Sequence, residues 1–262
     1  MPITVLVTGA SSGIGRATAL AFAEHGARVF GTSRHPRPAG DGVEMLELDV
    51  RSAESVRRCV ERVGRIDVLV NNAGVMCEGF AEEVTPAQAQ EVLEANFLGT
   101  VRVTNAVLPG MRARRAGRIV NVGSLAAWVG EPGEGFYAAS KAALARYTEA
   151  LRQEVWHLGI AVSLVEPGAF RTGVLAAAPA VESRIADYDG PRESAHHTLH
   201  RALRRGEDPG KVAELIRRIA ASRSPRGRYG AGRGACWVPR LKTLLPQRLF
   251  EFALRRAYRL PR

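Results

Sequence analysis

The stretch ITVLVTGASSGIG, residues 3–15, decides the fold of this chain. Its apolar run predicts a strand, and the glycine-rich segment after it predicts a tight turn into a helix. Gly9 permits the turn, Gly13 lets backbone approach a phosphate, and Gly15 lets the helix pack closely on the strand. The positive N-terminal end of that helix favours a pyrophosphate, so we interpret the stretch as a dinucleotide-binding loop. The predicted contacts are Gly9, Ser11, Ser12, Gly13, Ile14 and Gly15.

Apolar runs alternate with amphipathic segments along most of the chain. The runs that predict strands are 3–9, 27–33, 43–49, 66–74, 117–124 and 160–168, and GACWVPR, 234–240, could add a final strand. Near-continuous apolar strands separated by helical segments indicate a parallel sheet buried on both faces. We therefore predict a single α/β domain over residues 1–262, a doubly wound sheet of about seven parallel strands with helices on both faces.

One long segment interrupts this alternation. Residues 173–210 are rich in Ala, Pro, Gly, His and Arg and have weak periodicity. So long a segment inside an α/β domain is more often functional than a simple connection, and we expect a substrate lid after the sixth strand. His196, His197 and His200 could bind a metal there, but we expect solvated lid residues and no metal site.

Composition excludes several classes of protein. With 262 residues and 46% hydrophobic content, the chain can bury a large core, and no stretch approaches 18 apolar residues. Cys59, Cys77 and Cys236 form neither a disulfide framework nor a metal-ligand spacing. A cytoplasmic protein fits these features best.

The net charge of +11 is concentrated near the C-terminus. Residues 190–262 hold 18 Lys and Arg against 5 Asp and Glu. No nucleic-acid-binding motif accompanies them, so we predict no nucleic-acid partner. We expect solvated helix faces, with an anionic membrane surface or an acidic carrier as open alternatives.

The second predicted strand bears on cofactor choice. NAD sites usually have an acidic residue at its end, whereas here Ser33 is followed by Arg34. Arginine can pair with a 2′-phosphate that a carboxylate would repel, which favours NADP(H).

GFYAASKAAL, residues 135–144, contains the first of only three lysines, in a chain that otherwise uses arginine. Tyr137 and Lys141 are four residues apart and share a helix face. The ammonium would lower the high pKa of the phenol, so Tyr137 could exchange a proton with a carbonyl or alcohol oxygen. Ser124, at a predicted strand end, could bind the same oxygen.

The order of these motifs resembles that of the short-chain dehydrogenase/reductase family, in its single-domain Rossmann-fold branch. The matching segments are TGASSGIG (8–15), LDV (48–50), NNAG (71–74), Asn96 in EANFLGT, Ser124 in VNVGS, YAASK (137–141) and EPGAFRT (166–172). The resemblance implies an NADP(H)-dependent oxidoreductase that moves a hydride between nicotinamide and a ketone or secondary alcohol.

The resemblance also implies roles for individual residues. Asn96, Ser124, Tyr137 and Lys141 would form the catalytic tetrad, in which Lys141 also binds the nicotinamide ribose and Asn96 holds a water. The other implied cofactor contacts are Asp49, Val50, Asn72, Ala73, Gly74, Pro167, Gly168 and Thr172.

The substrate is less defined by the sequence. Leu125 and Trp128 would line an apolar pocket with Ser124 and Tyr137, which suggests a medium to large hydrophobic ketone or alcohol. The C-terminal stretch resembles, more weakly, the 17β-hydroxysteroid and retinol dehydrogenase branch. This favours a steroid-, retinoid- or polyketide-like substrate. A 3-oxoacyl thioester (acyl carrier) reductase and a non-catalytic NADP-binding regulatory protein remain alternatives.

The sequence also suggests two surfaces through which the protein could associate with a partner. The family resemblance implies a homodimer or homotetramer through helices near 86–115 and 138–157. Within the basic C-terminal segment, about 240–262, residues 247–260 predict an amphipathic helix. It could pack on its own domain, a partner subunit or a membrane surface.

Overall fold

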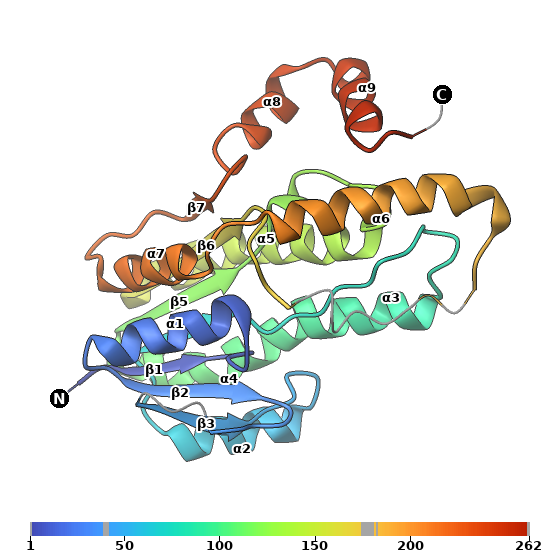
Figure 1. Cartoon of the computed structure of the whole chain (residues 1–262). Coiled ribbons are helices and arrows are strands. Elements are labelled where there is room, and N and C mark those ends of the chain that lie inside the picture. The colour runs from blue at the N-terminus through green and yellow to red at the C-terminus, as the bar shows by residue number, and fades with distance from the viewer. Residues whose placement is uncertain (1, 39–41, 174–180, 182, 261–262) are drawn as a thin grey trace.

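A computed structural model describes residues 2–38, 42–173, 181 and 183–260, and its centre is one parallel sheet. The strand order is β3-β2-β1-β4-β5-β6-β7, and every pairing is parallel (Figure 1). The strands are β1 (Thr4–Val7), β2 (Arg28–Ser33), β3 (Val43–Glu47), β4 (Val68–Asn71), β5 (Gly117–Val122), β6 (Ile160–Pro167) and β7 (Arg228–Ala231). This confirms the predicted doubly wound α/β fold, whose order reverses between β1 and β4.

Helices cover both faces of the sheet. Helices α1 (Gly13–Glu24) and α7 (Gly210–Ala221) pack on one face, and α2 (Ala53–Val63), α4 (Gly99–Arg114) and α5 (Gly135–Val155) on the other. Side chains of one strand alternate between the two cores: Val5 and Val7 lie beneath α1 and α7, while Leu6 lies on the opposite side. A strand buried on both faces needs an uninterrupted apolar run, as the sequence has.

The predicted helix over 86–115 is divided in three. It consists of α3 (Pro86–Leu93), one π-helical turn η1 (Glu94–Leu98) and α4. Thr85 and Gln88 form a reciprocal capping box at the start of α3, with Pro86 in the first turn. The π-helical turn contains Asn96 and turns its side chain inward, where it is completely buried.

The described residues between β6 and β7 include a helix that contacts the loop after β4. Part of the predicted lid, residues 174–180 and 182, lies outside the described residues. The described part contains η5 (Ala186–Tyr188) and α6 (Asp189–Arg204). Arg192 of α6 is paired with the buried Glu83, and His196 and His200 contact Glu78.

The prediction of a strand at 234–240 is wrong. The last strand, β7, lies earlier, and residues 234–240 form a turn and the start of α8 (Val238–Leu244). Gly232 and Gly234 both have φ of +82°, which ends the extended chain, and Pro239 cannot donate to a sheet but fits the first turn of a helix.

Helix α9 (Gln247–Ala257) follows α8, and the two stand outside the layered body (Figure 1). The end of α9 is attached to the lid, because Tyr258 is buried and its carbonyl accepts a hydrogen bond of 2.7 Å from Ser194 of α6. The amphipathic helix predicted at 247–260 is therefore present, but it leaves large apolar side chains exposed, including Leu249 and Phe252.

Candidate active site

The glycine-rich loop after β1 is shaped by close backbone packing. Gly9 and Gly13 have φ of +67° and +54°, a backbone conformation that residues other than glycine rarely adopt. A Cβ on Gly15 would lie 2.2 Å from the carbonyl oxygen of Gly9 and 2.4 Å from Nδ2 of Asn72. The sequence interpretation of these glycines therefore has a steric basis.

Two other strand ends are held against this loop. The hydroxyl of Thr8 accepts hydrogen bonds from the backbone N–H of Asn72 (2.9 Å) and of Ala73 (3.0 Å). Asn72 Nδ2 donates to the carbonyls of Thr8 and Gly9 at 3.0 Å. Thr172, beyond β6, packs over Gly13. The predicted cofactor residues of three separate motifs thus meet at the carboxyl edge of the sheet.

The end of β2 fits the ribose end of a dinucleotide. The hydroxyl of Ser33 is buried and has no hydrogen-bond partner among the described residues, so a ligand hydroxyl could satisfy it. A cavity of about 310 Å³ lies between the glycine-rich loop and the segment that follows β2. Its lining includes Ser11, Arg16, His35 and Arg37. Two guanidinium groups in this cavity suit a phosphate, and the sequence interpretation had named only Arg34.

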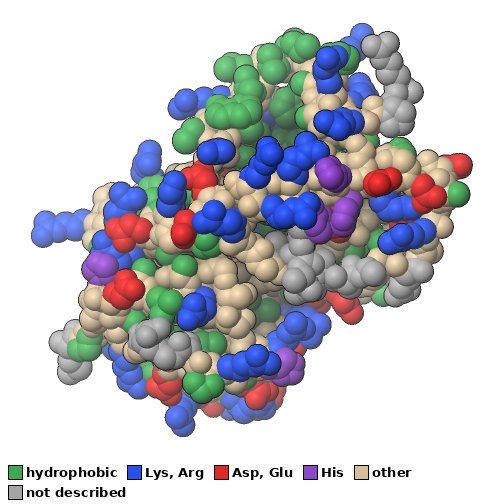
Figure 2. All heavy atoms as spheres, viewed as in Figure 1, with side chains coloured by type: hydrophobic (Ala, Val, Ile, Leu, Met, Phe, Trp, Pro, Cys, Tyr) green, Lys and Arg blue, Asp and Glu red, His purple; other side chains and the backbone are tan. Residues whose placement is uncertain are grey.

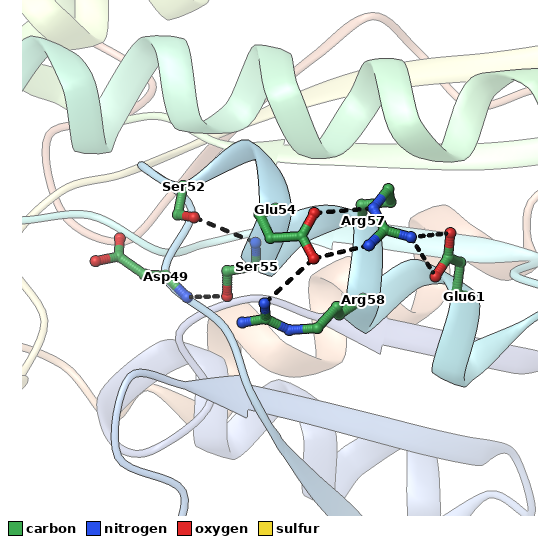
Figure 3. Close-up of polar contacts among 7 residues, drawn as sticks. All are labelled: Asp49, Ser52, Glu54, Ser55, Arg57, Arg58 and Glu61. Carbon is green, nitrogen blue, oxygen red and sulfur yellow. Dashed lines mark hydrogen bonds and ion pairs between the residues drawn. The ribbon is translucent and has the colours of Figure 1, made fainter.

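Asp49, a predicted cofactor contact, is paired with a neighbouring arginine in this structure. Its carboxylate forms an ion pair with Arg51 at 2.7 Å, and this hydrogen bond lowers the pKa of Asp49, with a smaller contribution from the charge of Arg34. Figure 3 shows the backbone nitrogen of Asp49 turned toward Ser55 at the start of α2, and its carboxylate turned away. Val50 packs against Gly99 at the start of α4.

The start of α5 and the end of β5 bring three tetrad residues together. The hydroxyls of Ser124 and Tyr137 are hydrogen-bonded to each other. Lys141 is 5% exposed, lies 5.8 Å from the ring centre of Tyr137, and donates a 2.9 Å hydrogen bond from Nζ to the carbonyl of Val122. Ser124 also accepts a 3.1 Å hydrogen bond from the backbone N–H of Ala126, which fixes its rotamer.

The acid–base properties differ from the sequence expectation. Burial raises the pKa of Tyr137 to about 12; the hydrogen bond from Ser124 lowers it, and the nearby Glu134 raises it. The lowering expected from Lys141 is not among the causes of the shift, and desolvation of the phenol is the largest of them. Burial also lowers the pKa of Lys141 to about 8. At neutral pH, Tyr137 therefore carries its proton, as a donor to a carbonyl oxygen must.

Asn96 connects the NNAG segment to α5, the helix that carries Tyr137. Its Oδ1 accepts from the N–H of Val75 at 2.7 Å, and its Nδ2 donates to the carbonyl of Val75 and to Ser140 Oγ, both at 2.9 Å. Ser140 in turn donates to the carbonyl of Tyr137 at 2.7 Å. A Cβ on Gly74 would lie 3.0 Å from Asn96 Oδ1, so the NNAG segment also depends on this contact. The side chain of Asn96 thus positions the segment that carries Tyr137.

The predicted substrate residues Leu125 and Trp128 lie in different surroundings. Leu125 lies in the short 3-10 turn η2 (Leu125–Ala127) directly after Ser124. Trp128 is half-buried, with the guanidinium of Arg228 stacked 4.4 Å over its ring, and therefore packs against β7. Gly168 approaches the carbonyl of Arg233 closely and donates its N–H to Ala231 at 2.9 Å, which orders the loop after Pro167.

Sequence reasoning missed a group of carboxyl groups next to Tyr137. Glu134, one turn before Tyr137 at the N-terminus of α5, is 3% exposed, and its Oε1 has no hydrogen-bond partner among the described residues. Burial and the charges of Glu131 and Glu78 raise the pKa of Glu134 to about 8. The side chain of Glu131 is hydrogen-bonded to that of Tyr258. Burial raises the pKa of Tyr258, and the contact with Glu131 raises it further. The only local signal was EPGEGF, a pair of acids in an otherwise apolar stretch.

Comparison with known proteins agrees with this geometry. The sequence pattern of the short chain dehydrogenases matches residues 3–182, and the chain therefore belongs to the short-chain dehydrogenase/reductase family of oxidoreductases, whose members bind a nicotinamide cofactor. This confirms the resemblance found in the sequence.

Individual relatives cover from about three quarters to nearly all of the chain. A 3-ketodihydrosphingosine reductase of Bacteroides thetaiotaomicron is 38% identical over 98% of both chains. A 3-oxoacyl-[acyl-carrier-protein] reductase of Vibrio cholerae is 36% identical over 72% of this chain and 85% of its own. The crystal structure of a short-chain dehydrogenase from Streptomyces avermitilis superposes with a TM-score of 0.82, at 34% identity over 98% of both chains.

We expect Glu134→Gln to change the pH dependence of stability. Between pH 4.5 and about 8 the folded state keeps a proton on Glu134 that the unfolded state has released, so Glu134 makes the wild type less stable as pH rises through this window. The variant should gain roughly 5 °C in Tm at pH 8 and little at pH 4.5. Thermal unfolding with a chelator present measures this. Glu24→Gln, on the exposed end of α1, is the control, and an equal gain at both pH values would contradict the assignment.

Proposed function

We propose that the protein reduces a ketone on a long apolar substrate of the 3-keto sphingoid-base class, with NADPH as the reductant. The observation that carries the reaction is the hydrogen-bonded pair of Ser124 and Tyr137 hydroxyls beside the buried ammonium of Lys141. The substrate class is supported by the likeness to the Bacteroides thetaiotaomicron reductase, which extends over the lid and the C-terminal helices.

Each side chain has a defined part in this proposal. Tyr137 donates its proton to the carbonyl oxygen, and Ser124 donates a hydrogen bond to the same oxygen as negative charge develops there. Lys141 is protonated below a pKa of about 8 and stabilises the phenolate that remains on Tyr137. The bound nicotinamide supplies the hydride to the carbonyl carbon. In the glycine-rich loop, Gly13 and the start of α1 would hold the pyrophosphate.

Three alternatives remain distinct from this proposal. The Vibrio cholerae relative favours a 3-oxoacyl thioester as substrate, but its match covers less of the chain than that of the sphingoid reductase. A non-catalytic NADP-binding regulator would not need the Ser124–Tyr137–Lys141 arrangement, which is complete. A steroid or retinoid ketone fits the same chemistry and is a competitor in the test.

A substrate panel tests the function, with NADPH absorbance as the readout. The panel contains 3-ketodihydrosphingosine, 3-oxoacyl thioesters on coenzyme A and on acyl carrier protein, and a steroid ketone. We expect the highest kcat/KM for the sphingoid ketone. Tyr137→Phe should lose about 10³-fold in kcat while it still binds NADPH, because only the proton donor is removed.

A clear preference for the carrier-bound thioester would replace the proposed substrate class. Tyr147→Phe, on the same helix, is the matched control and should retain activity. Comparable turnover by Tyr137→Phe would refute the role of Tyr137.

The NADPH preference rests on the cavity at the end of β2. We expect Arg16→Ala and Arg37→Ala each to raise the KM for NADPH about tenfold or more and to leave that for NADH unchanged, because each removes a charged hydrogen bond to the 2′-phosphate. Arg34→Ala should have a smaller effect, since Arg34 is not among the residues lining the cavity. A wild-type preference for NADH would overturn the assignment of NADPH. If Arg34→Ala had the largest effect, Arg34 would be the residue that binds the 2′-phosphate, as the sequence predicted.

An anionic membrane surface is the proposed partner of α8 and α9. The exposed side chains Leu244, Leu249 and Phe252 are 79%, 51% and 51% accessible, and Trp237 and Leu241 add to them. Figure 2 shows this hydrophobic surface at the top of the molecule with Lys and Arg around it. The flanking cations are Arg240, Lys242, Arg248, Arg255, Arg256 and Arg259, against a single acid, Glu251. Apolar side chains beside cations suit anionic phospholipid, where a sphingoid substrate would dissolve. Among the described residues no helix is long and apolar enough to cross a bilayer.

Vesicle flotation tests this contact. The protein should float with vesicles containing anionic phospholipid and not with neutral ones, and Leu249→Glu combined with Phe252→Glu should abolish flotation. Trp156→Glu, equally exposed at the end of α5, is the control. Absence of flotation, or a solution dimer lost in the double variant, would assign the surface to a second copy of the chain instead. The predicted homodimer or homotetramer through α4 and α5 is a separate surface and stays a prediction.

A further inference from the structure

A cluster of two histidines and one carboxylate joins the lid to the body of the protein. His196 and His200 lie on α6, and Glu78 lies in the loop that follows β4. His196 Nδ1 is 2.8 Å from Glu78 Oε1, and His200 Nε2 is 3.2 Å from Glu78 Oε2. The two imidazole ring centres are 3.8 Å apart. Histidine side chains form a visible group on the face of the molecule where α6 lies (Figure 2).

The arrangement has the geometry of a metal site. Residues four apart on a helix present their side chains from one face, so a single ion can reach both imidazoles. One nitrogen from each histidine and one carboxylate oxygen all lie within 4.8 Å of one another. Zn²⁺ binds histidine nitrogen at about 2.0–2.1 Å and carboxylate oxygen at about 2.0–2.2 Å, so its tetrahedral ligands are separated by roughly 3.3 Å. Small side-chain movements would bring the three atoms to that separation.

The groups near the cluster include a buried carboxyl group and a cation with its own partners. Glu134 lies within electrostatic range of Glu78. Arg192, the cation of the same helix nearest in sequence to His196, is paired with Glu83 and Asp189. Its charge is therefore largely balanced within its own contacts.

We propose that Glu78, His196 and His200 bind a divalent transition-metal ion, with Zn²⁺ as the best fit, and that this ion fastens α6 to the loop after β4. Three protein ligands leave one position for water, and the exposed fraction of His196, 54% of its side chain, gives the ion a path from solvent. The sequence alone predicted solvated histidines, because Glu78 lies more than 100 residues away. His197 is exposed on the same helix and is not part of the cluster.

The consequence is a lid whose attachment depends on metal. An ion that binds only the folded state stabilises it in proportion to the logarithm of its concentration above Kd. Loop 78–79 also contacts the segment that precedes Tyr137, because the N–H of Gly79 donates to the carbonyl of Gly133 at 2.9 Å. The metal would therefore also order the approach to the catalytic helix, without contacting the reacting atoms.

The test is metal binding by the full chain with no affinity tag, in a Cys236→Ser background that removes the exposed thiol. Chelator-treated protein is titrated with Zn²⁺ by calorimetry and with Co²⁺ by visible absorption. We expect one Zn²⁺ per chain with a micromolar or lower Kd, and a Co²⁺ spectrum of four or five ligands without thiolate bands. Hydrogen exchange of α6 should slow at least tenfold when Zn²⁺ is added.

The variants distinguish this site from adventitious binding. His200→Ala and Glu78→Gln should each weaken Zn²⁺ binding at least tenfold, and His197→Ala should leave it unchanged. No saturable binding below 1 mM, or equal binding by wild type and Glu78→Gln, would overturn the proposal and leave the cluster as a hydrogen-bonded contact. These readouts use no turnover, so they hold or fail independently of the proposed ketone reduction.

Discussion

The contact between the loops after β1 and β4 is the interaction on which the site depends. One hydroxyl, that of Thr8, accepts two backbone hydrogen bonds from Asn72 and Ala73, and the amide of Asn72 donates back to Thr8 and Gly9. The loops approach so closely that only glycine fits at position 15. Because β1 and β4 lie where the strand order reverses, this contact closes one side of the crevice in which α/β proteins bind nucleotides.

A second set of buried polar contacts positions α5, the helix that carries Tyr137 and Lys141. Asn71 donates to Asn121 on the neighbouring strand at 2.9 Å, and Asn121 donates to Thr148 of α5 at 2.9 Å. Asn96 acts through Ser140 on the turn that carries Tyr137. Buried amides must be paired, so these contacts fix the position of α5 more precisely than apolar packing would. Asn96 lies in the π-helical turn η1, where its side chain is completely buried.

Much of the fold could be predicted because its signals are local. A strand buried on both faces needs a continuous apolar run, and the turn after β1 needs glycine, so 3–15 specified the first βα unit. The wrong strand prediction at 234–240 also came from a local signal, because a short apolar run resembles a strand. Gly232, Gly234 and Pro239 were the signals against a strand there. The break in the helix at 94–98 left no comparable signal, since π-turns have no simple sequence pattern.

The sequence by itself determined the family and the parallel sheet, and it predicted Asn96, Ser124, Tyr137 and Lys141 as the catalytic tetrad, because residue type and order are enough for these. The tertiary structure decided what depends on neighbours distant in the chain. Burial raised the pKa of Tyr137 against the expected effect of Lys141, and folding brought Glu78 to the histidines of α6. Desolvation and contacts across more than 100 residues depend on how elements pack, and no local pattern records them.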